Sequence, residues 1–466
     1  MERLGTFYQG GIVSELDVYD VIIIGGGPAG LAVGSELSYK HKVLVIDKNV
    51  AGKTSRSWFI PLDAIDDKVM PYTYNGVTRF ITQTFGGADI AWNTELFDRY
   101  PYVNEKTLLP HWREVITGNG SLVLDECTYV DSDVNAGMVS VETSLGRFRG
   151  RLLIDASGYN SPIVKKYKID RDAYYWWSVA GSINEHPNGL NGMNVGDYMM
   201  WQTFKNTNAD VDASMASGRP IFSYEILNDD TSFSFAFYLR TERVPREVME
   251  KEYMTLLRDE PATANFHEVV IKEPKFGWYP AGALSQQIAE DNVVFIGDAG
   301  CWTTPCGWGM TFILRNYSEF AGKMSVLLDE NRLDKASLLS VPHYKVHEKY
   351  EVLLDTIVTH FLSRASASQL DRFINLFNKI PKILCEKVFT LTISREEVHV
   401  MLQAMLDEFQ LSELVRILPS ADYLLVLDEV KYFAEDAVLD EMHKVFGLFD
   451  KEQAQPSGLN NGYNFG

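Results

Sequence analysis

The first fifty residues contain two short apolar runs, separated by a glycine-rich turn and a segment of mainly small and apolar residues. The run 21–24 (VIII) leads into 25–30 (GGGPAG), and the run 43–46 (VLVI) ends at Asp47. Apolar runs without polar alternation are typical of strands that are buried on both faces. The order therefore predicts a strand, a turn, a helix and a second strand, followed by an acid.

The turn has the glycine spacing of a dinucleotide-binding unit. Gly25 permits a tight turn, Gly27 allows the backbone to approach a pyrophosphate, and Gly30 allows the helix to pack closely on the strand. Asp47 follows Gly27 at the distance of about 20 residues where an acid accepts hydrogen bonds from ribose hydroxyls. A glycine-rich turn without a ligand is the alternative interpretation. The candidate binding residues of this unit are Gly25, Gly27, Ala29, Gly30, Asp47 and Lys48.

The chain then leaves this unit and returns to it. The aromatic, turn-rich segment 70–105 predicts short strands, 108–116 predicts a helix, and 121–141 predicts a meander of short strands. The segment 154–158 (IDASG) predicts a buried strand that ends in Asp155 and Gly158. We expect this strand to lie in the same sheet as the first one.

Residues 170–285 have a different pattern, rich in aromatic residues at strand spacing. Phe233, Phe235 and Phe237 alternate with smaller residues, which is the period of a sheet with one apolar face. That face is a candidate wall of a substrate site, and ordinary sheet core is the alternative. The run 292–296 predicts another buried strand, which leads into Gly297 and Asp298, and a helix begins near Gly309.

From about residue 340 the pattern becomes helical, and the apolar stripes at 353, 357 and 361 and at 370, 373, 374 and 377 indicate helix faces packed in a core. The expected fold is α/β, with a doubly wound nucleotide-binding domain, a β-sheet substrate domain and a helical C-terminal region. The expected bounds are 17–165 with 285–340, then 166–284, then 341–451. Segment 60–105 is a candidate contribution to the substrate domain.

Composition narrows the class of partner. The 466 residues have a net charge of −20, which excludes the basic footprint of a nucleic-acid-binding protein and weakens attraction to anionic lipid. No apolar run reaches the ~18 residues of a membrane span, and the N-terminal segment lacks the apolar core of a signal peptide. Four cysteines in so long a chain indicate reduced thiols, so we expect a cytoplasmic protein. Peripheral membrane contact and the oligomeric state stay open.

Three separated turns, at 25–30, 155–158 and 297–298, together resemble the FAD-binding pattern of the flavoprotein superfamily of monooxygenases, geranylgeranyl reductases and lycopene cyclases. The resemblance implies FAD as the cofactor, with its ribityl chain bonded to Asp298. It also implies that Pro305 and Gly307 lie against the flavin ring and that a new helix points its N-terminus at the ring. The residues added in this way are Arg56, Asp155, Gly158, Gly297, Asp298, Pro305, Gly307, Gly309 and Met310. For Arg56 a solvated side chain is the alternative.

Within that superfamily the sequence is most similar to lycopene cyclases, over the stretches 177–181, 282–307 and 345–405. Cyclases carry a Phe-Leu-Glu-Glu-Thr stretch to which acid chemistry is assigned. The corresponding residues 238–242 read YLRTE, so the acidic pair is missing and Glu242 is displaced. The cyclase His-Pro before the flavin is replaced by Thr304 and Pro305. Because protonation of an alkene needs a positioned acid, this departure favours redox chemistry on another apolar substrate.

Three residues are candidates for chemistry. Cys306 flanks the expected flavin face, where a helix N-terminus would lower the pKa of its thiol, and Trp308 would shape a flat apolar pocket. Glu242 is the remaining acid of the cyclase-like stretch. Simple packing is the alternative for Cys306 and for Trp308. No metal site is expected, because His343 and His347 are the only histidines at ligand spacing and the Glu of a zinc-protease helix is missing between them.

The sequence therefore predicts an FAD-dependent oxidoreductase of the hydroxylase, reductase or desaturase type, acting on a hydrophobic small molecule of isoprenoid or polyene type. No second complete strand–GxGxxG–helix unit is visible, so no separate NAD(P)H domain is expected. NAD(P)H would dock transiently as electron donor, or electrons would come from a partner or the substrate. Three alternatives stay open. They are a non-redox cyclase that uses reduced FAD with Glu242 as proton source, a flavin-dependent halogenase suggested by 58–61 (WFIP), and a non-catalytic flavin- or polyene-binding protein.

Overall fold

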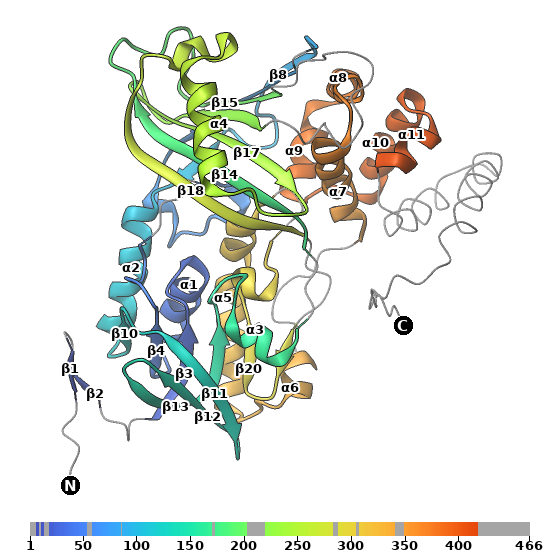
Figure 1. Ribbon diagram of the computed structural model, residues 1–466. Coiled ribbons are helices and arrows are strands. Elements are labelled where there is room, and N and C mark those ends of the chain that lie inside the picture. The colour runs from blue at the N-terminus through green and yellow to red at the C-terminus, as the bar shows by residue number, and fades with distance from the viewer. Residues whose placement is uncertain are drawn as a thin grey trace, which may run out of the picture.

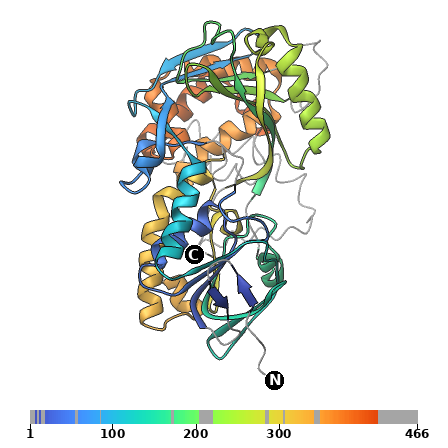
Figure 2. The same cartoon turned by 90° about the vertical axis from the view of Figure 1, so that its left-hand side faces the viewer.

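The protein is described by a computed structural model with two sheet-based halves, one above the other (Figure 1). The lower half contains a mainly parallel sheet and the upper half a seven-stranded sheet. The turned view shows the C-terminal helices, in orange and red, packed against the upper sheet (Figure 2). The described residues are 6–8, 11–13, 18–53, 58–84, 86–169, 173–202, 220–282, 288–303, 307–340 and 349–417.

The parallel sheet is built from the apolar runs that the sequence singles out. In spatial order its parallel strands are β10 (Leu122–Leu124), β4 (Val43–Ile46), β3 (Val18–Ile24), β13 (Gly146–Asp155) and β20 (Val293–Phe295). The short strand β19 (Ala289–Glu290) adds to β20 in the antiparallel direction. The predicted strand–turn–helix–strand unit and the returning strand at 154 are both confirmed.

Helices on one face and a meander on the other bury this sheet on both sides. Val21 and Ile23 point into a core with the helices α1 (Pro28–Leu37), α2 (Glu105–Gly118) and α5 (Gly309–Asp329). Ile22 and Ile24 point into the opposite core, which α3 (Pro162–Tyr167) completes. Burial on both faces explains why these strands are continuous apolar runs. A further helix, α6 (Lys335–Ser340), follows α5.

The predicted meander exists, but it starts later than expected. The strands β11 (Tyr129–Asn135) and β12 (Met138–Thr143) pair antiparallel with each other and with the first half of β13. The segment at 122–124 instead joins the parallel sheet beside β4. A two-stranded sheet of β1 (Thr6–Tyr8) and β2 (Gly11–Val13) lies near the N-terminus.

The upper sheet draws strands from two distant parts of the chain. Among its described strands, all pairings are antiparallel except that of β15 (Asp197–Gln202) with β7 (Arg79–Gln83). Its order is β18 (Val270–Gly282), β14 (Ala173–Glu185), β17 (Thr231–Arg240), β16 (Ile221–Ile226), β15 (Asp197–Gln202), β7 (Arg79–Gln83) and β8 (Asp89–Asn93). A small third sheet contains β5 (Trp58–Phe59), β9 (Tyr100–Val103) and β6 (Thr73–Val77). Two 3₁₀ helices, η1 (Leu62–Ala64) and η2 (Met70–Tyr72), connect its strands.

The expectation of a one-sided sheet at 233–239 is wrong, because both faces of β17 are buried. The helix α4 (Arg246–Arg258) and the 3₁₀ helix η4 (Pro261–Phe266) cover the face that contains Ser234. Ser234 Oγ is satisfied there by Tyr253 Oη at 2.9 Å and by Asn184 Nδ2 at 2.7 Å. The polar residues of the alternation are therefore buried and paired, not solvated.

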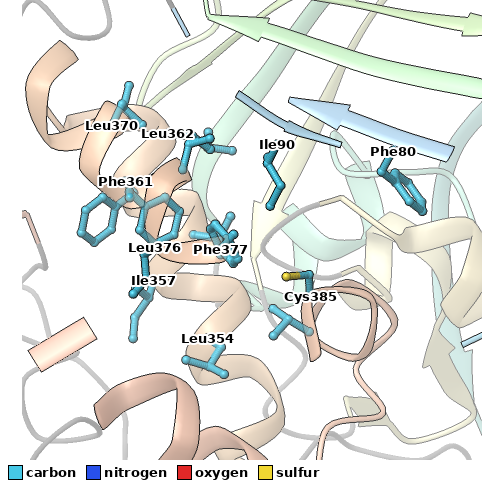
Figure 3. Packing of buried hydrophobic residues seen from close by; sticks show 14 of the residues in the cluster. Phe80, Ile90, Leu354, Ile357, Phe361, Leu362, Leu370, Leu376, Phe377 and Cys385 are labelled. Carbon is cyan, nitrogen blue, oxygen red and sulfur yellow. The ribbon is translucent and has the colours of Figure 1, made fainter. Parts of the chain in front are cut away.

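The other face of β17 packs against the C-terminal helices. Figure 3 shows Leu362 of α7 (Lys349–Arg364) and Phe377 of α8 (Ala367–Phe377) on the side of these helices that faces Ile90 of β8, and all three belong to one core. Phe361 and Phe373 stack with ring centroids 4.2 Å apart, which confirms that the apolar stripes form core. None of the described helices is long and apolar enough to cross a membrane. The helices are α7 (Lys349–Arg364), α8 (Ala367–Phe377), α9 (Lys382–Thr390), α10 (Arg395–Glu408) and α11 (Leu411–Ile417).

Candidate functional site

Four parallel strands end at the same level of the lower sheet. Ile24 of β3 is in register with Ile46 of β4 and with Asp155 of β13, which in turn is in register with Phe295 of β20. The hydrogen-bond ladder between β3 and β4 continues one residue beyond the end of β3, because Gly25 N–H donates to the Ile46 carbonyl at 2.8 Å. The three turns that the sequence singles out therefore meet at one edge, as expected for a nucleotide site in an open α/β sheet.

The glycines of the first turn have two different roles. A Cβ at Gly25, where φ is +107°, would lie 2.3 Å from the Ala156 carbonyl oxygen, and a Cβ at Gly30 would lie 1.9 Å from the Gly25 oxygen. These two glycines are required by close packing. A Cβ at Gly27 would meet no described atom within 4 Å, and no described side chain caps α1 there. Gly27 thus presents an open helix N-terminus, which fits a phosphate group.

The carboxylate of Asp47 lies beside the first glycine-rich turn and also stabilises it by hydrogen bonds. Its Oδ2 accepts a hydrogen bond from Gly26 N–H at 2.7 Å, and its Oδ1 accepts one from Asn49 N–H at 2.7 Å. Each carboxylate oxygen has a second lone pair for a ligand hydroxyl. The next residue, Lys48, is exposed to solvent.

Asp155 is completely buried and organises the second turn. Its Oδ1 accepts hydrogen bonds from Ser157 N–H at 3.0 Å and Ser157 Oγ–H at 2.6 Å, and its Oδ2 accepts one from Ser161 Oγ–H. Ser161 in turn caps α3. The carboxylate therefore shapes the turn, and Gly158, with φ of +85°, lies at its open end.

The third turn lies against the first. Gly297 and Asp298 begin the 3₁₀ helix η5 (Gly297–Gly300), and φ at Gly297 is +58°. A Cβ at Gly297 would lie 2.9 Å from the Cβ of Ala29 in the first turn of α1. The half-buried Asp298 thus lies near the same helix N-terminus as Gly27. Arg56, Pro305 and Cys306 lie outside the described residues.

The loop after η5 reaches the upper sheet. A Cβ at Gly307 would lie 3.1 Å from Tyr279 Cε2 and 3.5 Å from Trp177 Nε1. The rings of Trp177 and Tyr279 are nearly parallel, with centroids 5.9 Å apart, and the ring of Trp308 packs edge-on against Phe59 at 5.2 Å. Gly307 and Trp308, which belong to the segment expected beside a flavin ring, therefore lie against aromatic residues of the seven-stranded sheet and of the small third sheet. The helix α5 begins there at Gly309, and Met310 is buried in its first turn.

Glu242 is not part of this arrangement. It lies two residues beyond the end of β17, in the turn toward α4, and its side chain is exposed. A different acid lies on the sheet. Glu225 of β16 is 4% exposed and pairs in register with Tyr198 and Phe233, and burial raises the pKa of its carboxyl to about 8. The signal that would have revealed Glu225 is one acid inside the apolar strand 221–226 (IFSYEI).

Comparisons with solved structures show the same fold at low sequence identity. A geranylgeranyl bacteriochlorophyll reductase-like protein from Thermoplasma acidophilum has a TM-score of 0.63 and 14% identity, and the match covers 86% of this chain and all of that one. A flavoprotein/dehydrogenase from Cytophaga hutchinsonii has a TM-score of 0.59 and 14% identity, over 84% of this chain and 100% of that one. Halogenase PltM in complex with phloroglucinol and FAD has a TM-score of 0.58 and 13% identity, over 88% and 96%.

No curated protein matches the sequence. A family model described as "Lycopene cyclase protein" matches residues 20–412, a span that includes all three turns, both large sheets and most of the C-terminal helices. The fold is that of FAD-binding flavoproteins with a helical C-terminal region. Because the matched span is most of the 466 residues, the chain belongs to the lycopene cyclase family.

Proposed function

We propose that the protein is an FAD-dependent oxidoreductase that acts on a hydrophobic small molecule of isoprenoid or polyene type. The observation that carries the proposal is the register of the four strand ends, which brings the open N-terminus of α1 at Gly27 together with Asp47 and Asp298. Gly307, further along the chain from Asp298, lies beside aromatic residues of the upper sheet, which are suited to an apolar ligand.

The residues present fit FAD from one end to the other. The N-terminus of α1 would hold the pyrophosphate, Asp47 the adenosine ribose, and Asp298 the ribityl chain. The start of α5 would lie beside the ring, where its partial positive charge favours electron density on the ring carbonyl. When bound, FAD supplies hydride or oxygen-activating chemistry at its ring. Pro305, Cys306 and Arg56 remain part of this proposal as candidate contacts.

The chain's own residues would position the substrate and keep water out. Trp177 and Tyr279 form a nearly parallel aromatic pair beside Gly307, and the next residue, Trp308, packs edge-on against Phe59, so an aromatic surface would line this region. Such a surface binds an extended apolar chain by contact area and excludes water from the reacting atoms. Redox chemistry, with NAD(P)H as the donor, is favoured over acid chemistry at Glu242 because that carboxyl is exposed to solvent.

Cyclisation is the second candidate, and it is favoured by family membership together with the buried acid Glu225. A carboxyl whose pKa is raised to about 8 stays protonated at neutral pH, as a proton donor must. Halogenation and non-catalytic polyene binding are the remaining candidates. Oxygen-dependent incorporation of halide by the purified protein would support halogenation. Flavin that no reductant reduces would support binding alone.

The test begins with the visible spectrum of the purified protein, followed by anaerobic reduction with NADH and with NADPH. We expect bound FAD in the wild-type protein and its loss in Gly27→Val, because the valine side chain enters the open space at the helix N-terminus. Gly322→Val is the matched control, since Gly322 is exposed on α5 and a Cβ there also meets no described atom within 4 Å. A colourless protein that does not take up added FAD would refute the proposal.

A further inference from the structure

Four buried polar atoms on two neighbouring strands lack a hydrogen-bond partner among the described residues. They are Nε2 and Oε1 of Gln202 in β15, Oγ of Ser223 in β16 and Oε2 of Glu225 in β16. The three residues are 1%, 0% and 4% exposed. Buried polar groups in native proteins nearly always have a partner, so a cluster without one calls for an explanation.

The three side chains share one face of the upper sheet. Gln202 is in register with Ile221, Ser223 with Met200, and Glu225 with Tyr198. Because side chains alternate along a strand, Ile221, Ser223 and Glu225 point to the same face. Ile221 belongs to the core that also contains Phe235, so this is the face toward the C-terminal helices and the small third sheet.

A fifth atom without a described partner belongs to the same place. The hydroxyl of Tyr102, in β9 of the third sheet, is buried and unpartnered among the described residues. Tyr102 belongs to the same core as Ile221, and the pKa of its hydroxyl is raised well above the usual value, first by burial and next by Glu225. The polar cluster is therefore bounded by the seven-stranded sheet and by the small third sheet.

This cluster connects with the loop expected beside the flavin ring. Tyr198, the register partner of Glu225, packs on Phe59 with ring centroids 5.1 Å apart. Phe59 in turn packs on Trp308 at 5.2 Å. An apolar molecule that lies along these rings would reach the polar cluster with one end.

The chemistry of the cluster defines the group that it would bind. Gln202 offers both an amide N–H and a carbonyl oxygen, and Ser223 offers a hydroxyl that donates or accepts. Glu225 is protonated at neutral pH, so its carboxyl adds a donor without a negative charge. A hydroxyl or carbonyl oxygen satisfies such a mixed set, whereas a hydrocarbon satisfies none of it.

We propose that Gln202, Ser223 and Glu225 bind a hydroxyl or carbonyl group at one end of the substrate. The substrate class is then an oxygenated isoprenoid or polyene and not a pure hydrocarbon. This inference rests on the proposed function, because it assumes an apolar ligand beside the flavin loop.

The test compares two ligands that differ only in one hydroxyl, phytanol and phytane, for binding to the FAD-loaded protein. We expect the wild-type protein to bind phytanol at least tenfold more tightly, and Ser223→Ala, Gln202→Leu and Glu225→Leu each to reduce that preference by about tenfold. Tyr224→Phe is the matched control, since Tyr224 lies on β16 but points to the opposite core. It should retain the preference.

A second measurement distinguishes a binding role from a structural one. Removal of an unpartnered polar atom relieves an unsatisfied group, so Ser223→Ala and Gln202→Leu should raise the melting temperature of the ligand-free protein. Equal affinity for phytanol and phytane, or binding of neither by a protein with a normal flavin spectrum, would overturn the inference and leave FAD binding intact. Absence of bound flavin would instead refute the proposed function.

Discussion

The carboxylate of Asp47 accepts a hydrogen bond from the backbone N–H of Gly26 at 2.7 Å, so the acid after the second strand holds the glycine-rich turn after the first. Its other oxygen accepts Asn49 N–H at 2.7 Å. One side chain therefore fixes the turn and also lies where a ribose would bind. Substitution of Asp47 should therefore affect both stability and cofactor binding.

Asp47→Ala should weaken FAD binding by about tenfold or more and lower the free energy of unfolding by about 1–3 kcal/mol, because two backbone donors lose their acceptor. Asp47→Asn keeps one acceptor oxygen and should lose less of both. The measurements are flavin titration and urea unfolding of the apoprotein. Loss of FAD affinity with unchanged stability would contradict the turn-holding role.

Gly30→Ala and Gly27→Ala should have opposite consequences. The methyl group at residue 30 would lie 1.9 Å from the Gly25 oxygen, so the helix must move, and we expect a loss of about 3 kcal/mol or more. At residue 27 the methyl group meets no described atom within 4 Å, so stability should change by less than about 1 kcal/mol while FAD affinity falls. Urea unfolding and flavin titration check both, and similar stabilities for the two variants would contradict the packing role of Gly30.

Glu225 should make the protein less stable as the pH rises. Its pKa is raised from 4.5 to about 8 by burial, so the folded protein retains a proton that the unfolded chain releases above pH 4.5. The stabilisation is complete below pH 4.5 and is lost as the pH rises to about 8, by roughly 5 kcal/mol in total. Glu225→Gln should remove this dependence, and urea unfolding between pH 5 and pH 9 measures the difference. Parallel pH profiles for the two proteins would exclude a protonated Glu225.

Glu386 anchors the C-terminal helices to the upper strands. Its carboxylate accepts hydrogen bonds from Tyr100 Oη–H at 2.6 Å and Glu95 N–H at 2.8 Å, and it is buried. Glu386→Ala should cost about 2–3 kcal/mol, since the buried Tyr100 hydroxyl and the half-buried donors beside it lose their acceptor, and Glu386→Gln should cost less. Thermal unfolding measures both. The flavin spectrum should not change, because these contacts lie outside the three turns, and a changed spectrum would show that this anchor affects the cofactor site.

The nucleotide half of the fold could be predicted from the sequence because its signals are local. The apolar run before Gly25, the glycine spacing and the acid at Asp47 all lie within one short segment. That Asp155 and Gly297 would lie beside the first turn followed from the rule that the ends of parallel strands meet at one edge of the sheet. The residue contacts within each turn could not be predicted, and Asp155 binds its own turn through Ser157 and Ser161.

The upper half could be predicted only in part, because its organisation depends on distant pairings. The alternation at Phe233 and Phe235 indicated a strand, but not that α4 covers the face of Ser234. Helix α4 did leave a signal, since Met249, Tyr253 and Leu256 recur at helical spacing and all three are buried. Glu225 was missed because a single acid in an apolar strand is ambiguous in the sequence. Only the pairing register of β16 shows that its side chain lies on a buried face.

The chain passes between the two halves more than once, and this limits how the protein can be divided into fragments. Residues 79–93 supply β7 and β8 to the upper sheet, yet the chain before and after them, at β4 and β10, builds the lower one. No single cut in the polypeptide would therefore release either half with all of its strands. Fragments and chimaeras would have to exchange several segments together, so mutational studies are better made on the intact chain.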